Sequence, residues 1–361
     1  MSTLRIILDD MISGESTNRS RYTENLTRGL IATAPRGAFV EGFVSLHKSS
    51  LAGRELTSAW QHGFTRMPGS GMVHAPSLLA PLARHDRLNE VNQIAVTIHD
   101  TLAWSNPEAL TSRRVGWYKS MLKRAERYAD AIVVPTHAVA DEITELSSLG
   151  DRVRVISGAP SSVFTTSVAT ESAEDDRFSS LSLPERFVLA IVEPGSRGAA
   201  LTLARSIGGM DESVPLLIVG IEPNDPELAS AIAESKLADQ RILALGVLGE
   251  PELRVVVERA AVLLAVTFEE GWGMPVLEAF ALGTPVVHLG TPALVELSDG
   301  AALVVDPESA DTFGDQVSNA ITSILEDSAL ADRLKYSGLD RARAFTWRSA
   351  AEKIWQLHAD L

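Results

Sequence analysis

The sequence predicts an α/β protein made of two doubly wound domains, each built on a parallel sheet. Three observations carry this prediction. The chain has 361 residues, a length at which one hydrophobic core becomes inefficient and two domains are expected. Short apolar runs alternate with amphipathic stretches throughout, which is typical of parallel strands covered by helices on both faces. Residues 165–185 interrupt the alternation with Ser, Thr and acidic residues, the composition of a linker.

The first predicted domain, residues 1–165, contains five expected strands, each a short run rich in β-branched residues. They are Leu4–Leu8, Phe39–Leu46, Ile94–Ile98, Ala131–Val134 and Val153–Ile156. Between them, apolar residues recur every three or four positions, as they do along one face of a helix. The expected helices are Tyr22–Ala34, Ser112–Ala129 and His137–Leu146.

The second predicted domain, residues 166–346, continues the same alternation with six expected strands. They are Phe187–Val192, Pro215–Val219, Ile242–Leu245, Val262–Thr267, Pro285–Leu289 and Ala302–Val305. The last stretch, Trp347–Leu361, has apolar residues at helical spacing. This final helix could close the second domain or cross back to the first.

The composition excludes several classes of protein. Hydrophobic residues make up 45% of the chain, too many for a disordered protein, and no stretch approaches the roughly 18 unbroken apolar residues of a membrane span. The first residues lack the pattern of a signal peptide. The absence of cysteine excludes disulfides, thiolate metal sites and cysteine nucleophiles. Together these features predict a cytoplasmic protein.

Charge is distributed unevenly along the chain. The net charge of −15 argues against a general nucleic-acid binder. Residues 1–165 hold 18 of the 32 basic and 16 of the 47 acidic residues, so the acidic excess lies in the second half. Basic residues gather instead in the helix expected over 112–129, at Arg113, Arg114, Lys119, Lys123, Arg124 and Arg127. This helix could bind an anionic membrane surface or a phosphorylated acceptor lipid; the alternative is an ordinary solvated face.

The segment Val262–Gly290 is the strongest candidate for a ligand site. An expected strand ends at Thr267, a loop follows, Pro275 stands where a helix would begin, and Gly283 would end that helix. Ligands of such sheets bind at the carboxyl ends of strands, where helix N-termini attract anions. Glu270 and Glu278, expected in the loop and in the first helical turn, could accept bonds from sugar hydroxyls. The alternative is that these acids only favour the helix N-terminus.

This segment resembles the donor site of the GT-B glycosyltransferases of family 4, which are retaining enzymes that use nucleotide sugars. The family pattern is two glutamates separated by seven residues within a glycine- and proline-containing loop and helix. Here it reads Glu270-Gly-Trp-Gly-Met-Pro-Val-Leu-Glu278-Ala-Phe-Ala-Leu-Gly283. Further similar segments follow in the same order along the chain: Arg21–Leu26, Val96–Asp100, Ala129–Val134, Leu183–Leu189, Glu193–Pro194, Ala302–Pro307 and Phe345–Trp347.

The resemblance implies a GT-B fold, in which two Rossmann-like domains border a cleft, and transfer of a hexose from a nucleotide diphosphate sugar to a glycan or lipid-linked acceptor. It also implies cell-envelope polysaccharide synthesis, retention of configuration, and neither a metal nor a further cofactor. His99 and Glu270 would contact the donor sugar, and Glu278 would bind the ribose hydroxyls. The donor would also be held by the segment Gly271, Trp272, Gly273, Met274 and Pro275, chiefly through backbone amides.

Two segments depart from the family pattern. A glycine loop usually precedes the Arg-Tyr-Thr helix, whereas this chain has Asn18-Arg19-Ser20, so Ser20 would face the diphosphate. Two cations usually follow Glu-Pro, whereas here only Arg197 is near. Arg197, or Arg19, would then offset the charge of the leaving group. The alternative function is a weakly active or inactive homologue that assembles with another glycosyltransferase, and the oligomeric state is left open.

Overall fold

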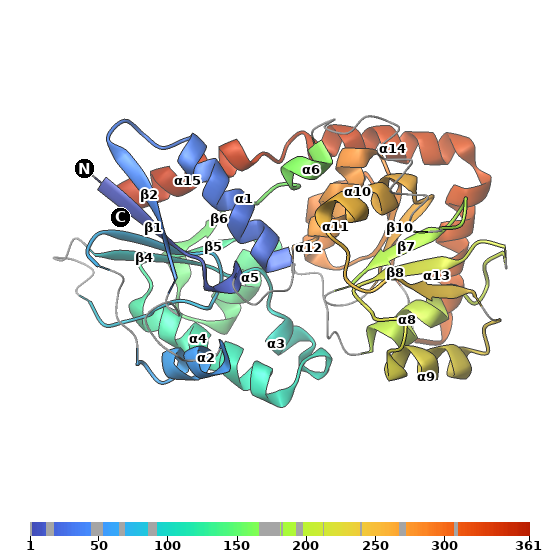
Figure 1. Ribbon diagram of the computed structural model, residues 1–361, viewed down its shortest axis with the longest axis horizontal. Coiled ribbons are helices and arrows are strands. Elements are labelled where there is room, and N and C mark those ends of the chain that lie inside the picture. The colour runs from blue at the N-terminus through green and yellow to red at the C-terminus, as the bar shows by residue number, and fades with distance from the viewer. Residues whose placement is uncertain are drawn as a thin grey trace. The chain divides into compact units, whose positions relative to one another are not determined.

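The structure is a computed structural model that divides the chain into two compact units (Figure 1). Unit 1 comprises residues 1–159 and 345–361, and unit 2 comprises residues 160–344. The residues described are 2–11, 18–44, 53–64, 69–85, 92–165, 181, 183–192, 198–211, 213–238, 240–266, 272–306 and 310–361, without the side chains of 53–56 and 310–311.

Unit 1 contains a sheet of six parallel strands in the order β2-β1-β3-β4-β5-β6. Their bounds are β1 Ser2–Ile7, β2 Ala38–Phe43, β3 Met72–Ala75, β4 Gln93–Thr97, β5 Ala131–Val134 and β6 Val153–Val155. The residues of β5 are all buried, as expected of a strand covered on both faces. The order reverses between β1 and β3, because β2 lies on one side of β1 and the later strands lie on the other.

The helices of unit 1 connect these strands and cover the sheet. They are α1 Asn18–Ala32, α2 Gly53–Gln61, α3 Leu102–Ser105, α4 Ser112–Tyr128, α5 His137–Leu146 and α15 Trp347–Asp360, with the short 3₁₀ helices η1 Asp9–Met11, η3 Pro107–Ala109 and η4 Gly150–Arg152. α15 packs along α1, and both termini of the chain lie in this unit (Figure 1). Trp355 donates from Nε1 to the carbonyl of Leu30 at 3.1 Å. The ring of Trp347 meets that of Tyr22 edge to face at 5.3 Å between centroids.

Several elements of unit 1 were not expected from the sequence, among them β3 and α2. β3 has only four residues, with a histidine in its interior, His74, which is fully buried. That side chain is accommodated because its Nε2 bonds to the hydroxyl of Thr97 on β4 at 3.1 Å. A polar residue within so short a run conceals the apolar pattern by which strands are recognised.

Unit 2 contains a second sheet of six parallel strands, in the order β12-β11-β10-β7-β8-β9. The bounds are β7 Val188–Ile191, β8 Leu216–Val219, β9 Ile242–Ala244, β10 Val262–Ala265, β11 Val286–Leu289 and β12 Leu303–Val305. All six strands expected in this half are present. The order reverses between β7 and β10, so each unit has one such reversal, and the predicted fold class of two doubly wound parallel sheets is confirmed.

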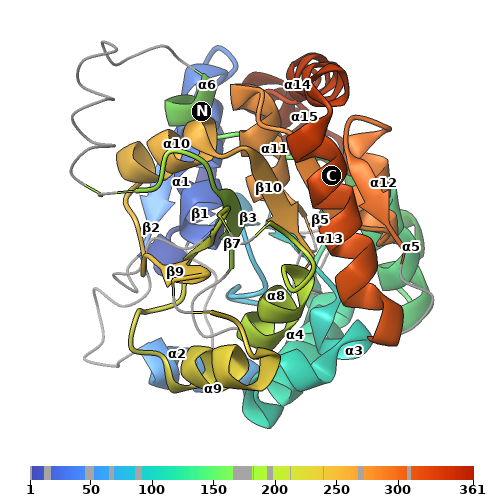
Figure 2. The same ribbon diagram turned by 90° about the vertical axis from the view of Figure 1, so that its right-hand side faces the viewer.

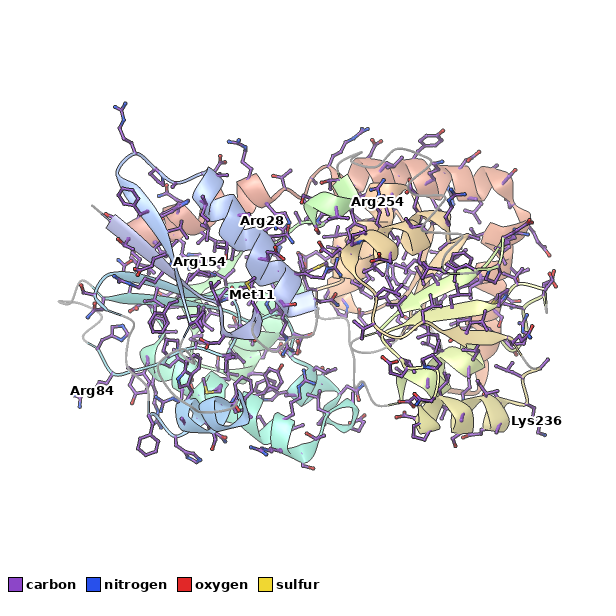
Figure 3. All side chains as sticks on the ribbon, viewed as in Figure 1. Met11, Arg28, Arg84, Arg154, Lys236 and Arg254 are labelled. Atoms are coloured by element: carbon purple, nitrogen blue, oxygen red, sulfur yellow. The ribbon has the colours of Figure 1, made fainter. Side chains whose placement is uncertain are left out.

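The helices of unit 2 are α6 Ser162–Thr165, α8 Ala199–Ser206, α9 Pro226–Ser235, α10 Glu250–Arg259, α11 Met274–Leu282, α12 Pro292–Ser298, α13 Ala310–Glu326 and α14 Ser328–Ala342. α8 packs against α9 and α13, whereas α10 packs against α11, and Figure 2 shows α8 and α9 across the sheet from α10 and α11. Arg254 on α10, labelled in Figure 3, donates to the carbonyl of Val163 on α6 at 3.0 Å. Among the described helices, none is both long and apolar enough to cross a bilayer.

Candidate active site

The predicted donor-binding segment lies in unit 2, where β10 leads into α11. β10 adjoins β7 at the reversal of strand order, the position at which sheets of this kind bind ligands. Three of the predicted residues, Glu270, Gly271 and Arg197, lie outside the described residues. Trp272 to Pro275 and Glu278 are described. The predicted helix start and end are confirmed, because Pro275 is in the first turn of α11 and Gly283 caps its end with a φ of 75°.

Glu278 lies deeper in α11 than expected. It is the fifth residue of the helix, at the start of the second turn, so its predicted place in the first turn is wrong. The reason is that the helix begins at Met274, one residue before the expected start at Pro275. Glu278 is 0% exposed, and burying an ionisable carboxylate is costly unless polar groups surround it. A surface acid that only favours a helix N-terminus would avoid this cost, so the capping explanation accounts poorly for Glu278.

The packing of unit 2 gives a reason for glycine at position 273 that is separate from the predicted contact with a ligand. Its φ is +69°, in the left-handed region, and a Cβ there would lie 2.6 Å from Leu297 Cδ2 and 2.8 Å from Leu294 Cδ2. Both leucines belong to α12. The neighbouring Trp272 is 6% exposed and Met274 is also buried. The side chains of this segment therefore face the protein interior, and the backbone is what remains to contact a ligand.

Substituting Gly273 with alanine is expected to lower the free energy of unfolding by about 1–2 kcal/mol, the cost of holding a side chain at positive φ. Gly300→Ala is a matched control, because Gly300 has a φ of +81° in the same unit with nothing within 4 Å of a built Cβ. Urea unfolding of both variants separates the two causes. A larger loss for Gly273→Ala measures the clash with α12, and equal losses would mean that the leucines move aside.

His99 lies in unit 1, just beyond the end of β4. Its Nε2 is 2.8 Å from the carbonyl oxygen of Pro76 and therefore carries the proton and donates. Burial, and after it the Arg19 guanidinium, lower the pKa of His99 to about 4, against the raising effects of the Pro76 bond and of Asp100. The ring is neutral at pH 7, so Nδ1 is its acceptor nitrogen. Tyr22 fixes the ring by an edge-to-face contact with centroids 4.6 Å apart.

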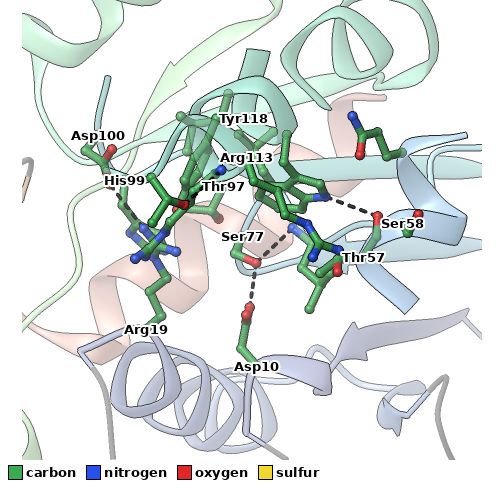
Figure 4. Close-up of a pocket in the computed structure, with 17 residues that line it drawn as sticks. Asp10, Arg19, Thr57, Ser58, Ser77, Thr97, His99, Asp100, Arg113 and Tyr118 are labelled. Carbon is green, nitrogen blue, oxygen red and sulfur yellow. Dashed lines mark hydrogen bonds and ion pairs between the residues drawn. The ribbon is translucent and has the colours of Figure 1, made fainter. Parts of the chain in front are cut away.

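His99 lines a pocket of about 610 Å³ that is formed entirely within unit 1 (Figure 4). The pocket lies where β1, β3 and β4 end, at the reversal of strand order, and α1, α2 and α4 complete its walls. Its polar and aromatic lining comprises Asp10, Arg19, Thr57, Ser58, Gln61, Ser77, Thr97, His99, Asp100, Thr111, Arg113, Arg114, Trp117 and Tyr118. Ser20, predicted to face the diphosphate, is the third residue of α1 and is not part of this lining, although the adjacent Arg19 is.

The two carboxylates of this pocket are engaged within it. Ser77 donates from its hydroxyl to Asp10, and the backbone N–H of Leu79 donates to Ser77 Oγ at 3.0 Å (Figure 4). Burial raises the pKa of Asp10, while the Ser77 bond and Arg19 lower it. Asp100 pairs with Arg19 at 3.5 Å. These arrangements present hydroxyl, carboxylate and guanidinium groups side by side, which is suited to a polyhydroxylated ligand.

The basic helix predicted over 112–129 is present as α4, and its cations have different environments. Arg113 and Arg114 are exposed side chains that line the pocket. Arg124 donates to the carbonyl of Leu82 within unit 1, so it is occupied by an internal contact. Lys119 and Lys123 are exposed. Binding of this helix to a membrane stays a prediction.

Sequence reasoning missed Asp10, Ser77, Trp117 and Tyr118 as members of one site. Asp10 and Ser77 each follow the end of a strand, which is a usable signal only when the strands are known to be neighbours. Trp117 and Tyr118 lie in the helix predicted over 112–129, in which only the basic residues were considered for a site. Within the described ranges, no group of three or more His, Asp or Glu residues is arranged to hold a metal ion.

Part of the chain is similar to a known family. Residues 197–323 match the family described as glycosyl transferases group 1. The matched segment covers about a third of the chain and lies within unit 2. Its similarity to the O-antigen chain mannosyltransferase B of Escherichia coli is 24% identity over 291 residues, which is 77% of this chain and 71% of that protein. Other curated relatives are longer, and the chain spans less than a third of the length of two of them.

Solved structures confirm that the chain has the GT-B fold. The sucrose-phosphate synthase from Thermosynechococcus elongatus superimposes with a TM-score of 0.75 at 20% identity, over 100% of this chain and 99% of the other. The Anabaena protein HepE in complex with UDP-glucose gives a TM-score of 0.70 at 15% identity, over 100% of both chains. At these identities the likeness carries the fold alone.

Proposed function

We propose that the chain transfers a hexose from a nucleotide diphosphate sugar to a glycan or lipid-linked acceptor with retention of configuration, as a family 4 enzyme. The observation that carries the proposal is the fully buried Glu278 on α11, beside the reversal of strand order in unit 2. The match of residues 197–323 to glycosyl transferases supports it. The UDP-glucose complex of HepE and the mannosyltransferase relative support a nucleotide sugar and a glycan acceptor.

In the proposed reaction the bond from the sugar C1 to the diphosphate oxygen breaks as a bond from C1 to the acceptor oxygen forms on the same face. The leaving phosphate takes the proton of the acceptor hydroxyl, so no strong protein base is needed and neither metal nor further cofactor takes part. Glu270 and His99 would hold the sugar, and Glu278 the ribose. The neutral state of His99 suits this role, because the Nδ1 of a neutral imidazole accepts a hydrogen bond from a sugar hydroxyl.

The proposed donor segment would use backbone groups. The N–H groups of Gly271 to Met274 precede or begin α11, and the first N–H groups of a helix lack partners within it. Pro275 contributes no N–H but fixes the first turn. Ser20 would contribute a hydroxyl to the same diphosphate. The cellular setting proposed is cytoplasmic, with a role in cell-envelope polysaccharide synthesis.

Glu278→Ala is expected to weaken nucleotide binding by about 1–3 kcal/mol, because it removes charge-assisted bonds to the ribose hydroxyls. Calorimetry with a panel of nucleoside diphosphates measures the affinity and identifies the base. Glu278→Gln is the matched control for the cavity that alanine creates, since it keeps the volume and removes the charge. Unchanged affinity in both variants would contradict the ribose assignment.

The wild-type protein also tests the proposal as a whole. We expect binding of at least one nucleoside diphosphate at millimolar concentration or below, and slow hydrolysis of its sugar conjugate without acceptor. If neither occurs, the enzyme proposal fails. The inactive homologue that assembles with another glycosyltransferase would then take its place.

A further inference from the structure

We infer that the pocket of unit 1 binds an acceptor that carries a phosphate group, with the phosphate at Arg113 and Arg114 and the sugar ring against Asp10, Thr97 and His99. The term acceptor rests on the proposed function. The binding of a sugar phosphate at this place is an independent claim, because every residue that carries it belongs to unit 1.

The positive charge of the pocket exceeds what its own acids can balance. Asp100 pairs with Arg19, and Asp10 accepts a hydrogen bond from Ser77. Within the part of the chain that the structure describes, Arg113 and Arg114 form no ion pair with any carboxylate, although both line the pocket. The planar guanidinium group of arginine matches the geometry of phosphate oxygens.

Tyr118 points to a missing ligand in the same place. It lines the pocket and is 6% exposed, yet its hydroxyl has no hydrogen-bond partner among the described residues. Buried hydroxyls are satisfied in most proteins, and one that is not requires an explanation. Two cations lie near the ring, with Arg19 Cζ 5.4 Å and Arg114 Cζ 6.0 Å from its centroid. A phosphate oxygen beside Arg114 would supply the acceptor that this hydroxyl lacks.

The exposure of the lining residues orients the ligand. Arg113 and Arg114 are exposed, whereas Thr97 is buried and His99 is partly buried. The anionic group therefore lies at the mouth of the pocket and the hydroxyl-bearing ring lies inside. Trp117 is held in the wall by donation from Nε1 to the carbonyl of Thr57 at 3.2 Å and offers an apolar ring surface. A phosphate at the mouth allows a free sugar phosphate or a lipid-linked one, since the lipid would extend into solvent.

The test measures binding to the full chain by ligand-observed NMR, without donor. The probes are glucose 6-phosphate, glucose, inorganic phosphate and a detergent-soluble lipid-linked sugar phosphate. We expect both sugar phosphates to bind at least about tenfold more tightly than glucose or inorganic phosphate, with affinity falling as salt rises. If the lipid-linked sugar phosphate binds more tightly than glucose 6-phosphate, the ligand of this pocket is lipid-linked. If the two bind equally, the ligand is a soluble sugar phosphate. Binding of glucose as tight as that of both sugar phosphates would overturn the inference.

Variants locate the binding. Arg113→Ala and Arg114→Ala are each expected to weaken sugar phosphate binding about tenfold, and Tyr118→Phe severalfold, because each removes a bond to the phosphate. Arg127→Ala is the matched control, since Arg127 is an exposed cation of α4 outside the pocket lining, and it should bind normally. Wild-type affinity in both arginine variants would overturn the assignment, as would displacement of the sugar phosphate by a nucleoside diphosphate.

The failure of this inference is distinguishable from the failure of the proposed function. Donor hydrolysis and nucleotide binding without any binding of sugar phosphates would overturn the inference alone. Binding of sugar phosphates that depends on Arg113 and Arg114, in a protein that binds no nucleotide, would support the inference and overturn the proposed transferase.

Discussion

Replacing Arg197 with alanine is expected to lower donor turnover about 100-fold or more while the fold persists, because a positioned charge that stabilises a leaving group contributes that much. The second half of the chain carries most of the acidic residues. Close by, the N–H of Gly198 at the start of α8 donates to the carboxylate of Glu227. A diphosphate would therefore meet negative charge at this end of α8, and Arg197 is the adjacent cation in sequence.

The measurement is steady-state hydrolysis of the nucleotide sugar that binds best, together with nucleotide affinity. Arg205→Ala is the matched control, because Arg205 lies on α8 and pairs with Glu234 at 2.8 Å on the exposed surface. It should retain wild-type turnover. If Arg197→Ala retains turnover within about threefold, the leaving-group charge is balanced elsewhere, and Arg19→Ala is then the variant expected to be inactive.

Acidification between pH 6.5 and pH 4 is expected to remove about 3 kcal/mol of stability through His358 alone. His358 on α15 is 2% exposed, and burial lowers its pKa to about 4. In the unfolded chain this histidine takes up a proton as the pH falls below about 6.5, whereas the folded protein keeps it neutral until about pH 4. The unfolded state thus binds more protons than the folded state across this window. The free energy of unfolding therefore decreases as the pH is lowered from 6.5, and the loss is complete near pH 4.

His74 on β3, a neighbour of His358, adds to this pH dependence. The His74 and His358 rings lie 5.9 Å apart, and the pKa of His74 is lowered well below its usual value by burial and then by the neighbouring His358 and His99. Urea unfolding from pH 7 to pH 4.5 measures the slope. His358→Phe should flatten it, whereas His137→Gln, at an exposed position on α5, should not. An unchanged slope in His358→Phe would exclude His358 as the cause.

The sequence predicts most clearly those elements whose boundaries are marked by backbone chemistry. The segment from β10 to β11 is an example. Its apolar run marks the strand, and the proline in the first helical turn and the glycine at the helix end mark where α11 begins and ends, because each of these two residues favours a narrow range of backbone conformations at its position. β3 lacked such marks. Its four residues include His74, whose burial depends on a bond to Thr97 on another strand.

The two candidate sites differ in how far they could be predicted. The donor segment is contiguous, so its spacing could be compared with a family pattern, although the position of Glu278 within the helix was misjudged. The pocket of unit 1 gathers Asp10, Ser77, His99 and Arg113 from segments far apart in the sequence. Their meeting depends on the order of strands in the sheet, and strand order is not encoded in local periodicity.

The packing of α15 on α1 has a consequence for biosynthesis. The helices α1 and α15 belong to the same unit, but all of unit 2 is synthesised between them. At typical rates of translation this interval is on the order of tens of seconds. During it, the surface of α1 that will receive Trp347 and Trp355 remains uncovered on the ribosome. Unit 1 therefore cannot complete its folding until all of unit 2 has been synthesised.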